Sequence, residues 1–268
     1  MDRRRLSKVN SFPKSEFERL RVVLVNTRNP LNIGAAARAM SNFGFLHLRV
    51  VNPFELAFRE ARSAVGAASL LAQAEEFKSF TEAIEDCSLV VGTTAFSRRD
   101  PQHAVRDLEE GARLIRKRLA SGRVAILFGS EKRGLSNEDL SHCHWLLRIP
   151  TREKHPSMNL GQAVAVCLYE LARDSASAAA AEKSALATAG DLERLSSLLL
   201  DALQACGYLK PETISVNQRR SAAPADEKIR RLIRRLNLSA EDARLLLGML
   251  RQILRELDTT KQRAMKER

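Results

Sequence analysis

Short polar side chains stand at three places where an apolar run gives way to a helical pattern. In NPLNIGAAARAM, Asn32 is followed about a turn and a half later by Arg38. In FGSEKRGLS, Glu131 lies between two glycines, and HPSMNL contains Ser157 and Asn159. Amide, hydroxyl and carboxylate groups can orient a polar ligand, and a guanidinium can grip a phosphate with its planar fork of donors. Together these residue types indicate a site that positions a polar substrate.

Each of these residues also has a purely structural explanation. Asn32 and Ser157 are suited to cap a helix, Arg38 can be a surface cation, and Glu131 can be a turn residue. The residues taken one by one leave this choice open. A functional site is favoured because all three segments are predicted to lie at the same edge of one sheet.

Alternating strands and helices are predicted to bring these segments together. Apolar runs predict strands near 21–26, 46–53, 88–95, 124–134 and 145–150. Helical periodicity predicts helices near 32–44, 58–74, 105–122 and 159–173, the first ended by Gly44. Such alternation is typical of an α/β fold with a parallel sheet, which binds ligands at the carboxyl ends of its strands. The loops at Asn26, Thr93, Gly129 and Pro150 should therefore share one edge.

The last third of the chain differs in composition. Residues 174–190 are rich in Ala and Ser and fit either a helical extension or a flexible linker. Three amphipathic patterns follow within 191–268, and Ser239 with Asp242 offers a cap for the third. One face of the second pattern carries five cations, which are either solvated or placed to track phosphates: Lys228, Arg230, Arg231, Arg234 and Arg235. The chain thus divides into a basic tail (1–20), an α/β domain (21–173), the Ala/Ser-rich segment (174–190) and a helical domain (191–268).

Charge and cysteine usage narrow the class of protein. The net charge of +12 and the pI near 10.1 favour a polyanionic partner such as nucleic acid or an anionic membrane face. Cys87, Cys143, Cys167 and Cys206 are scattered through apolar segments, which indicates reduced thiols in the core of an intracellular protein. The amino-terminal segment has no apolar signal region, and no run approaches the length of a membrane span. We therefore expect a cytoplasmic protein.

Familiar cofactor signatures are missing or incomplete. No G-x-G-x-x-G follows a strand, so the sequence does not indicate nicotinamide or flavin binding. Gly129 and Gly134 have the spacing of a phosphate loop, but Leu135 and Ser136 stand where Lys and Ser or Thr are needed. Neighbouring residues of a strand point apart, so the HCHW stretch is unsuited to a metal site and no metal is expected.

The three motifs, taken in order, resemble a known family. NIGAAARAM, ILFGSEKRGLSNEDL and RIPTREKHPSMNLGQAVAVCLYEL are similar to the three motifs of the SPOUT superfamily of RNA methyltransferases, in its TrmH-like 2′-O-ribose branch. Within that branch, the tRNA cytidine/uridine 2′-O-methyltransferases of the anticodon loop resemble nearly the whole chain. The resemblance implies a parallel-sheet fold with a deep carboxyl-terminal trefoil knot, a homodimer, and methyl transfer from S-adenosylmethionine to tRNA, at nucleotide 32.

The resemblance also implies roles for individual residues. A substrate and reaction set would comprise Asn32, Arg38, Glu131, Ser157 and Asn159. A cofactor pocket would comprise Thr93, Thr94, Ala95, Gly129, Ile149, Pro156, Ser157, Met158 and Leu160. Glu131 would fix Arg38 or the cofactor loop. Dimer contacts are expected along the last helix of the domain, which carries Ala163, Val166, Cys167 and Leu171.

Arg38 presents a chemical difficulty. The family proposal makes it the base that removes the ribose proton, with help from Asn32. An arginine is effectively always protonated, and a nearby phosphate stabilises the cation further. We therefore expect Arg38 to clamp an RNA phosphate. Two alternatives stay open: an rRNA 2′-O-ribose methyltransferase, and an RNA-binding protein that has lost catalysis.

Overall fold

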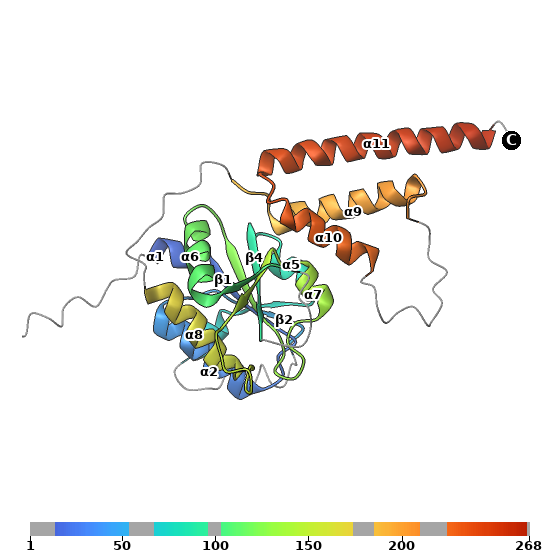
Figure 1. The fold of residues 1–268 in the computed structure, drawn as a ribbon. Helices are drawn as coiled ribbons and strands as arrows, with labels where there is room; N and C mark the ends of the chain where they lie inside the picture. The colour runs from blue at the N-terminus through green and yellow to red at the C-terminus, as the bar shows by residue number, and fades with distance from the viewer. Residues whose placement is uncertain (1–13, 54–66, 96–102, 174–184, 210–223, 267–268) are drawn as a thin grey trace, which may run out of the picture.

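A seven-stranded sheet forms the centre of the computed structural model, which describes residues 14–53, 67–95, 103–173, 185–209 and 224–266 (Figure 1). All neighbouring strands are parallel, in the order β3-β2-β1-β6-β4-β7-β5. The strands are β1 (Leu20–Val25), β2 (Leu48–Val51), β3 (Glu75–Phe77), β4 (Leu89–Thr94), β5 (Val105–Asp107), β6 (Val124–Phe128) and β7 (Trp145–Arg148). The α/β class with a parallel sheet is confirmed.

Helices cover both faces of the sheet. In the first domain they are α1 (Lys14–Phe17), α2 (Pro30–Phe43), α4 (Ala68–Ala72), α5 (Phe80–Ile84), α6 (Leu108–Leu119), α7 (Asn137–Ser141) and α8 (Leu160–Arg173). The central strands are apolar on both sides because both sides are covered. Thus Val22 and Leu24 pack with α2, α6 and α8, whereas Val23 and Val25 pack in a second cluster with α5.

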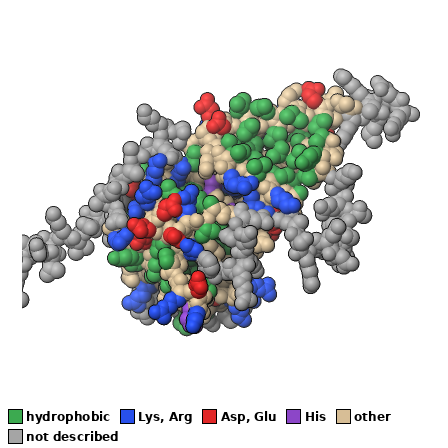
Figure 2. Space-filling view, in the orientation of Figure 1, with side chains coloured by type: hydrophobic (Ala, Val, Ile, Leu, Met, Phe, Trp, Pro, Cys, Tyr) green, Lys and Arg blue, Asp and Glu red, His purple; other side chains and the backbone are tan. Residues whose placement is uncertain are grey.

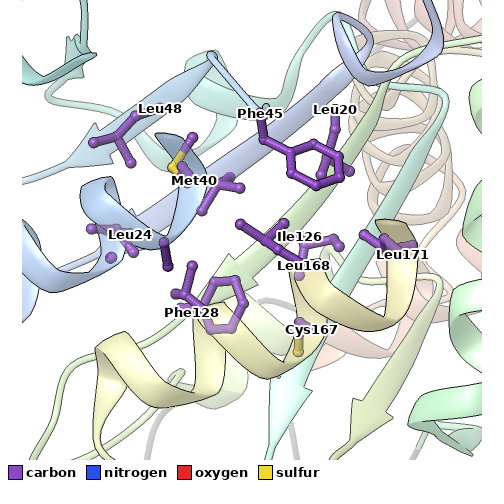
Figure 3. Packing of buried hydrophobic residues seen from close by; sticks show 14 of the residues in the cluster. Leu20, Leu24, Met40, Phe45, Leu48, Ile126, Phe128, Cys167, Leu168 and Leu171 are labelled. Atoms are coloured by element: carbon purple, nitrogen blue, oxygen red, sulfur yellow. The ribbon is translucent and has the colours of Figure 1, made fainter. Parts of the chain in front are cut away.

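The larger core lies between the sheet and the pair α2 and α8. Figure 3 shows Leu24 of β1 and Phe128 of β6 on one side, with Met40 of α2 and Leu168 of α8 close to them. The two helices approach closely: a Cβ added at Gly161 of α8 would lie 2.5 Å from the Ala35 Cβ of α2. This packing brings the start of α8 beside the start of α2.

Three further helices form a small carboxyl-terminal bundle: α9 (Ala189–Ala205), α10 (Ala225–Arg235) and α11 (Ala240–Lys266). Its own apolar core includes Leu192, Leu195, Ile233 and Leu247. The bundle attaches through the segment that precedes β4, where Ala189 N–H donates to the Cys87 carbonyl at 2.8 Å and Gly190 N–H to that of Glu85 at 3.0 Å. It therefore lies at the amino edge of the sheet, opposite the carboxyl ends of the strands (Figure 1).

Several local predictions are corrected. The expected helix 105–122 begins with the edge strand β5, and β3 was not predicted; each has only three residues and no buried side chain, so neither produces an apolar run. Cys87, Cys143 and Cys167 are buried, but Cys206 is exposed at the end of α9 rather than in a core. Parts of the predicted basic tail (1–13), of the helix 58–74 and of the Ala/Ser-rich segment (174–184) lie outside the described residues.

Helix α9 begins at Ala189, inside the range predicted as a linker. Ser239 accepts a hydrogen bond from Asp242 N–H at 3.0 Å, as predicted for the third helix. Within the described ranges, no helix has both the length and the apolar character that crossing a membrane requires.

Candidate active site

Three loops meet at the carboxyl edge of the sheet. They follow β1 (26–29), β6 (129–136) and β7 (149–159), and β6 lies directly between β1 and β4 in the sheet. Strand β1 continues to β2 on one side while β6, β4 and β7 extend on the other, so the chain reverses its direction across the sheet here. In open parallel sheets, ligands bind at such a reversal.

A relay of hydrogen bonds joins the three loops. Asn159 Nδ2 donates to Asn32 Oδ1 at 2.7 Å, and Asn32 Nδ2 donates to Glu131 Oε1 at 2.9 Å. Asn29 N–H also donates to Glu131 Oε1, at 3.3 Å. Asn32 is buried, and both ends of its amide are engaged. The predicted residues Asn32, Glu131 and Asn159 therefore form one connected group.

The structural explanations as caps hold for Asn159 but not for Asn32 or Ser157. Helix α2 is capped by Asn29, whose side chain accepts from Leu31 N–H at 3.0 Å, and Pro30 follows in the first helical position. Asn32 is the third residue of the helix and lies within its first turn. Helix α8 is capped by Asn159, whose Oδ1 accepts from Gly161 N–H at 2.9 Å. Ser157 is exposed and is not a cap.

Glu131 is held as a carboxylate by donors from the first loop. Partial burial by itself would raise its pKa, but hydrogen bonds from the Asn32 side chain and from the backbone of Arg28 and Asn29 lower the pKa below the ordinary value. The expected contact between Glu131 and Arg38 is not formed. Glu131 instead occupies the amino terminus of α2, where the free N–H groups favour a negative charge.

Arg38 is exposed on α2. Its side chain forms no hydrogen bond or ion pair with any other residue in the described part of the chain. A guanidinium in this state keeps its donors available to an external anion.

The residues predicted to line a cofactor pocket lie at the ends of three adjacent strands and in the segments that follow them. Thr93 Oγ1 donates to the Leu127 carbonyl at 2.7 Å, and Thr94 Oγ1 donates to that of Ala95 at 3.1 Å. The Pro156 carbonyl accepts from Thr151 Oγ1 at 3.1 Å. On the apolar side, Leu160 is buried, whereas Ile149 and Met158 are half-buried. These segments follow β4, β6 and β7, which are neighbours in the sheet.

The loop's own backbone passes close to Gly129. A Cβ there would lie 2.1 Å from the Gly134 carbonyl carbon and 2.2 Å from Leu135 N. The chain's own backbone thus occupies the space that a side chain at 129 would need. The loop closes on itself, with Gly134 N–H donating to the Ser130 carbonyl at 2.8 Å. Glycine is required at 129 because the backbone of Gly134 and Leu135 leaves no room for a Cβ there.

The basic face predicted on α10 is mostly buried at the opposite edge of the sheet. Arg234 Nη2 lies 3.5 Å from Glu193 Oε2 and donates to the Ala189 carbonyl at 3.3 Å, and Arg230 Nη1 donates to Ser141 Oγ at 2.8 Å. Arg231 is buried beside Glu227. Both alternatives left open for this face are wrong for these three arginines. Arg230 joins the bundle to α7 of the first domain, whereas Arg231 and Arg234 pair with residues of the bundle itself.

The HCHW stretch belongs to the same buried junction. His144 Nδ1 accepts a hydrogen bond from Val90 N–H at 3.1 Å, and His142 Nδ1 lies 3.3 Å from Glu193 Oε2. In the part of the chain that the structure describes, no three His, Cys, Asp or Glu side chains are grouped so as to hold a metal ion.

Asn29 is the site residue that sequence reasoning missed. It caps α2 and donates its own N–H to Glu131. The signal was present, since Asn followed by Pro is a typical start of a helix. It was overlooked because Asn32 lies three residues further on and was assigned that place.

Comparisons with known proteins cover nearly the whole chain. Residues 19–169 match the SpoU rRNA Methylase family. The tRNA (cytidine/uridine-2′-O-)-methyltransferase TrmJ of Sodalis glossinidius (strain morsitans) is 34% identical over 240 residues, which cover 87% of this chain and 91% of that protein. An uncharacterized tRNA/rRNA methyltransferase of Haemophilus influenzae is 32% identical over 254 residues, which cover 92% of this chain and 99% of that protein.

Solved structures give the same result. The crystal structure of TrmJ from Z. mobilis ZM4 superposes with a TM-score of 0.72 at 30% identity, covering 87% of this chain and 97% of that one. A probable methylase family protein from Haemophilus influenzae superposes with a TM-score of 0.55 at 31% identity, covering 91% of this chain and 99% of the other. The likeness therefore includes the carboxyl-terminal helices as well as the α/β domain.

Proposed function

Because this chain belongs to the SpoU rRNA methylase family, we infer that it is an S-adenosylmethionine-dependent tRNA 2′-O-ribose methyltransferase. The observation that carries this function is the match, along nearly the full length of both chains, to tRNA (cytidine/uridine-2′-O-)-methyltransferases. The resemblance drawn from the three motifs is thereby confirmed. We propose a cytidine or uridine of the anticodon loop, at nucleotide 32, as the methylated residue.

The residues at the carboxyl edge suit the proposed cofactor. S-adenosylmethionine supplies an activated methyl group on a sulfonium. Its adenine needs an apolar surface beside backbone donors and acceptors, which Ile149, Met158 and Leu160 would provide together with the loop 149–159. The segments at Thr94, Ala95 and Gly129 end the two neighbouring strands and would complete the pocket.

Arg38 and Ser157 are the proposed contacts to substrate. Both are exposed, and Arg38 has no ion pair with a described residue, so it is available to clamp an RNA phosphate beside the reacting ribose. Ser157 would contact that ribose. Asn32, Glu131 and Asn159 contact one another, and we assign them the task of holding the three loops in register. This arrangement orients the 2′-hydroxyl for in-line attack, and orientation is the main resource for such a displacement.

The relay also limits which group takes the ribose proton. Both ends of the Asn32 amide are engaged with Asn159 and Glu131 rather than with Arg38, and an amide oxygen is a very weak base. A carboxylate with a lowered pKa, such as Glu131, is a weak base. The proton therefore leaves to solvent or to a group of the RNA.

We propose that the chain from β6 to α8 forms the family's trefoil knot. Strand β7 lies beyond β4, on the side away from β1, yet α8 returns to pack on α2. The return path passes the loop after β6, where Glu131 meets Asn32. Threading of this kind would keep the site rigid without a ligand.

A homodimer through the outer sides of α2 and α8 completes the proposal. Cys167 and Leu171, expected at the contact, are buried in the chain's own core. Tyr169 of α8 remains, 53% exposed and stacked edge-on against Phe43 of α2 with ring centroids 6.1 Å apart. Leu31 on α2 is 79% exposed. Light scattering of the Tyr169→Glu variant should show a monomer if this surface forms the contact.

Methyl transfer from labelled S-adenosylmethionine to purified tRNA and rRNA tests the function directly. Label on tRNA, mapped by mass spectrometry to a ribose in the anticodon loop, is the expected result. Label on rRNA alone would favour the alternative suggested by the uncharacterized tRNA/rRNA methyltransferase of Haemophilus influenzae. Calorimetry showing no binding of S-adenosylmethionine would favour an RNA-binding protein without catalysis.

A further inference from the structure

Exposed cations without internal partners surround the candidate site. Five belong to the three site loops, and none forms a side-chain hydrogen bond or ion pair with another described residue: Arg28, Lys132, Arg133, Arg152 and Lys154. We call these five side chains the rim cations. The same loops contain only two carboxylates, Glu131, which is held by Asn32, and Glu153. Figure 2 shows Lys and Arg side chains along the lower rim of the molecule, below the starts of α2 and α8 in Figure 1.

The carboxyl-terminal bundle is different in charge and surface. Over 185–209 and 224–266, twelve Lys and Arg stand against nine Asp and Glu. Of the five cations of α10, Arg231 and Arg234 are buried and Arg230 is 11% exposed. Hydrophobic side chains gather over α9 and α11 in Figure 2. The exposed cations of α10 and α11 are spread along these two helices, away from the three site loops: Lys228, Arg235, Arg244, Arg251 and Arg255.

We propose that the rim cations bind the phosphodiester backbone of the RNA on both sides of the nucleotide that is methylated. The proposal rests on the proposed function in one respect, that RNA is the substrate. Exposed cations bind phosphates without a large desolvation cost, and each contact releases a counterion. Three loops that surround Asn32, Glu131 and Asn159 can contact phosphates on more than one side of a ribose placed there.

This assignment separates binding from catalysis. Contacts to phosphate fix the position of the RNA but do not read its bases. Loss of rim cations should therefore weaken binding to every tRNA by a similar factor. Turnover at saturating RNA should change little, because Arg38 and the relay are untouched.

The experiment compares three double variants of the full chain. Lys132→Gln/Arg133→Gln and Arg152→Gln/Lys154→Gln each remove two rim cations, whereas Lys228→Gln/Arg235→Gln removes the two exposed cations of α10 as a matched control. Fluorescence anisotropy measures the affinity for tRNA between low and moderate salt. Each rim variant should bind about ten-fold more weakly, and its plot of log affinity against log salt should be shallower by roughly 1.5.

The control pair should match the wild-type chain in both affinity and salt slope. Affinity for S-adenosylmethionine should be equal in all four proteins, and kcat should stay within about two-fold. A control pair that weakens binding as much as the rim variants would overturn the proposal, as would rim variants with wild-type affinity and slope. A wild-type chain that binds tRNA but transfers no methyl group would contradict the proposed function alone, since the binding comparison still tests the rim.

Discussion

The two edges of the sheet use arginine in opposite ways. At the amino edge, Arg234 is 1% exposed and lies against Glu193, where it holds α10 to α9 within the carboxyl-terminal bundle. At the carboxyl edge, Arg38 and Arg133 are exposed and without a partner among the described residues. Arginine is thus a buried structural residue at one edge and an exposed residue available to a ligand at the other. Clustered positive charge in a sequence therefore does not identify a binding surface until the acidic partners are placed.

Of the variants that test this contrast, Glu193→Gln should have the largest effect, a loss of stability at the amino edge. It removes the carboxylate shared by His142, Arg230 and Arg234, and leaves buried guanidinium groups uncompensated. The free energy of unfolding should fall by about 3 kcal/mol, measured by urea denaturation. The neighbouring exposed pair of Arg194 and Asp191 provides the control, and Arg194→Gln should cost less than about 0.5 kcal/mol. Equal losses for the two variants would show that the junction is no more than a surface ion pair.

At the carboxyl edge, the Arg38→Lys variant tests whether Arg38 clamps a phosphate or acts as a base. An ammonium keeps the charge but lacks the bidentate fork, so the variant should retain much of its tRNA affinity and lose about 100-fold in single-turnover methyl transfer. Binding of S-adenosylmethionine should be unchanged. If Arg38 were instead the base, lysine with its lower pKa would restore the rate between about pH 8 and 10. We expect no such recovery, and near wild-type turnover at high pH would contradict the phosphate clamp.

Acid should lower the free energy of unfolding through a buried histidine at the amino edge. Burial, together with Arg234, lowers the pKa of His144 to about 3, so the folded protein holds this side chain neutral. The unfolded chain takes up a proton as the pH falls below about 6.5, and stability is lost from there down to about pH 3, at about 1.4 kcal/mol per pH unit. His144→Asn keeps an acceptor for Val90 N–H without the titrating group. Urea denaturation at pH 7 and 5.5 should show a smaller loss of unfolding free energy in the variant than in the wild-type chain. Equal losses in the two proteins would show that His144 is not the cause.

Two substitutions of Asn159 distinguish its role as a helix cap from its role in the hydrogen-bond relay. Asn159→Asp keeps an acceptor for Gly161 N–H but replaces the donor that faces Asn32 Oδ1. Asn159→Ala loses both. Thermal denaturation should show a loss of about 1 kcal/mol for the alanine variant relative to the aspartate variant. Methyl transfer should be impaired in both, whereas normal activity in the aspartate variant would show that capping is the whole role of this residue.

The carboxyl edge was predictable from sequence because its residues follow buried strands. Apolar runs located the strands, and the parallel class then placed Asn32, Glu131 and Asn159 at one edge. The orientation of each amide was beyond prediction, since it depends on which partner another loop supplies. Asn29 and Gly129 show the same limit: one takes the cap assigned to Asn32, and the other makes room for backbone five residues away.

The amino edge was mispredicted for a physical reason. Arg230, Arg231 and Arg234 lie on one face of an amphipathic helix, a pattern that normally indicates solvent. The burial of Arg230 and Arg234 depends on Glu193 and Ser141, which come from two other helices, so nothing local to α10 reveals it. The exposed edge strands β3 and β5 were missed because only their pairing with β2 and β7 defines them.

The hydrogen bond between Asn32 and Asn159 spans 127 positions of the sequence. During synthesis, α2 leaves the ribosome long before α8 exists, so the amino-terminal part of the site waits for its other half. Contacts this distant along the chain also carry a large loop-closure cost and form slowly. The chain should therefore acquire its site in a single late step, after residue 173 has been made, and truncated nascent chains should have no partial activity.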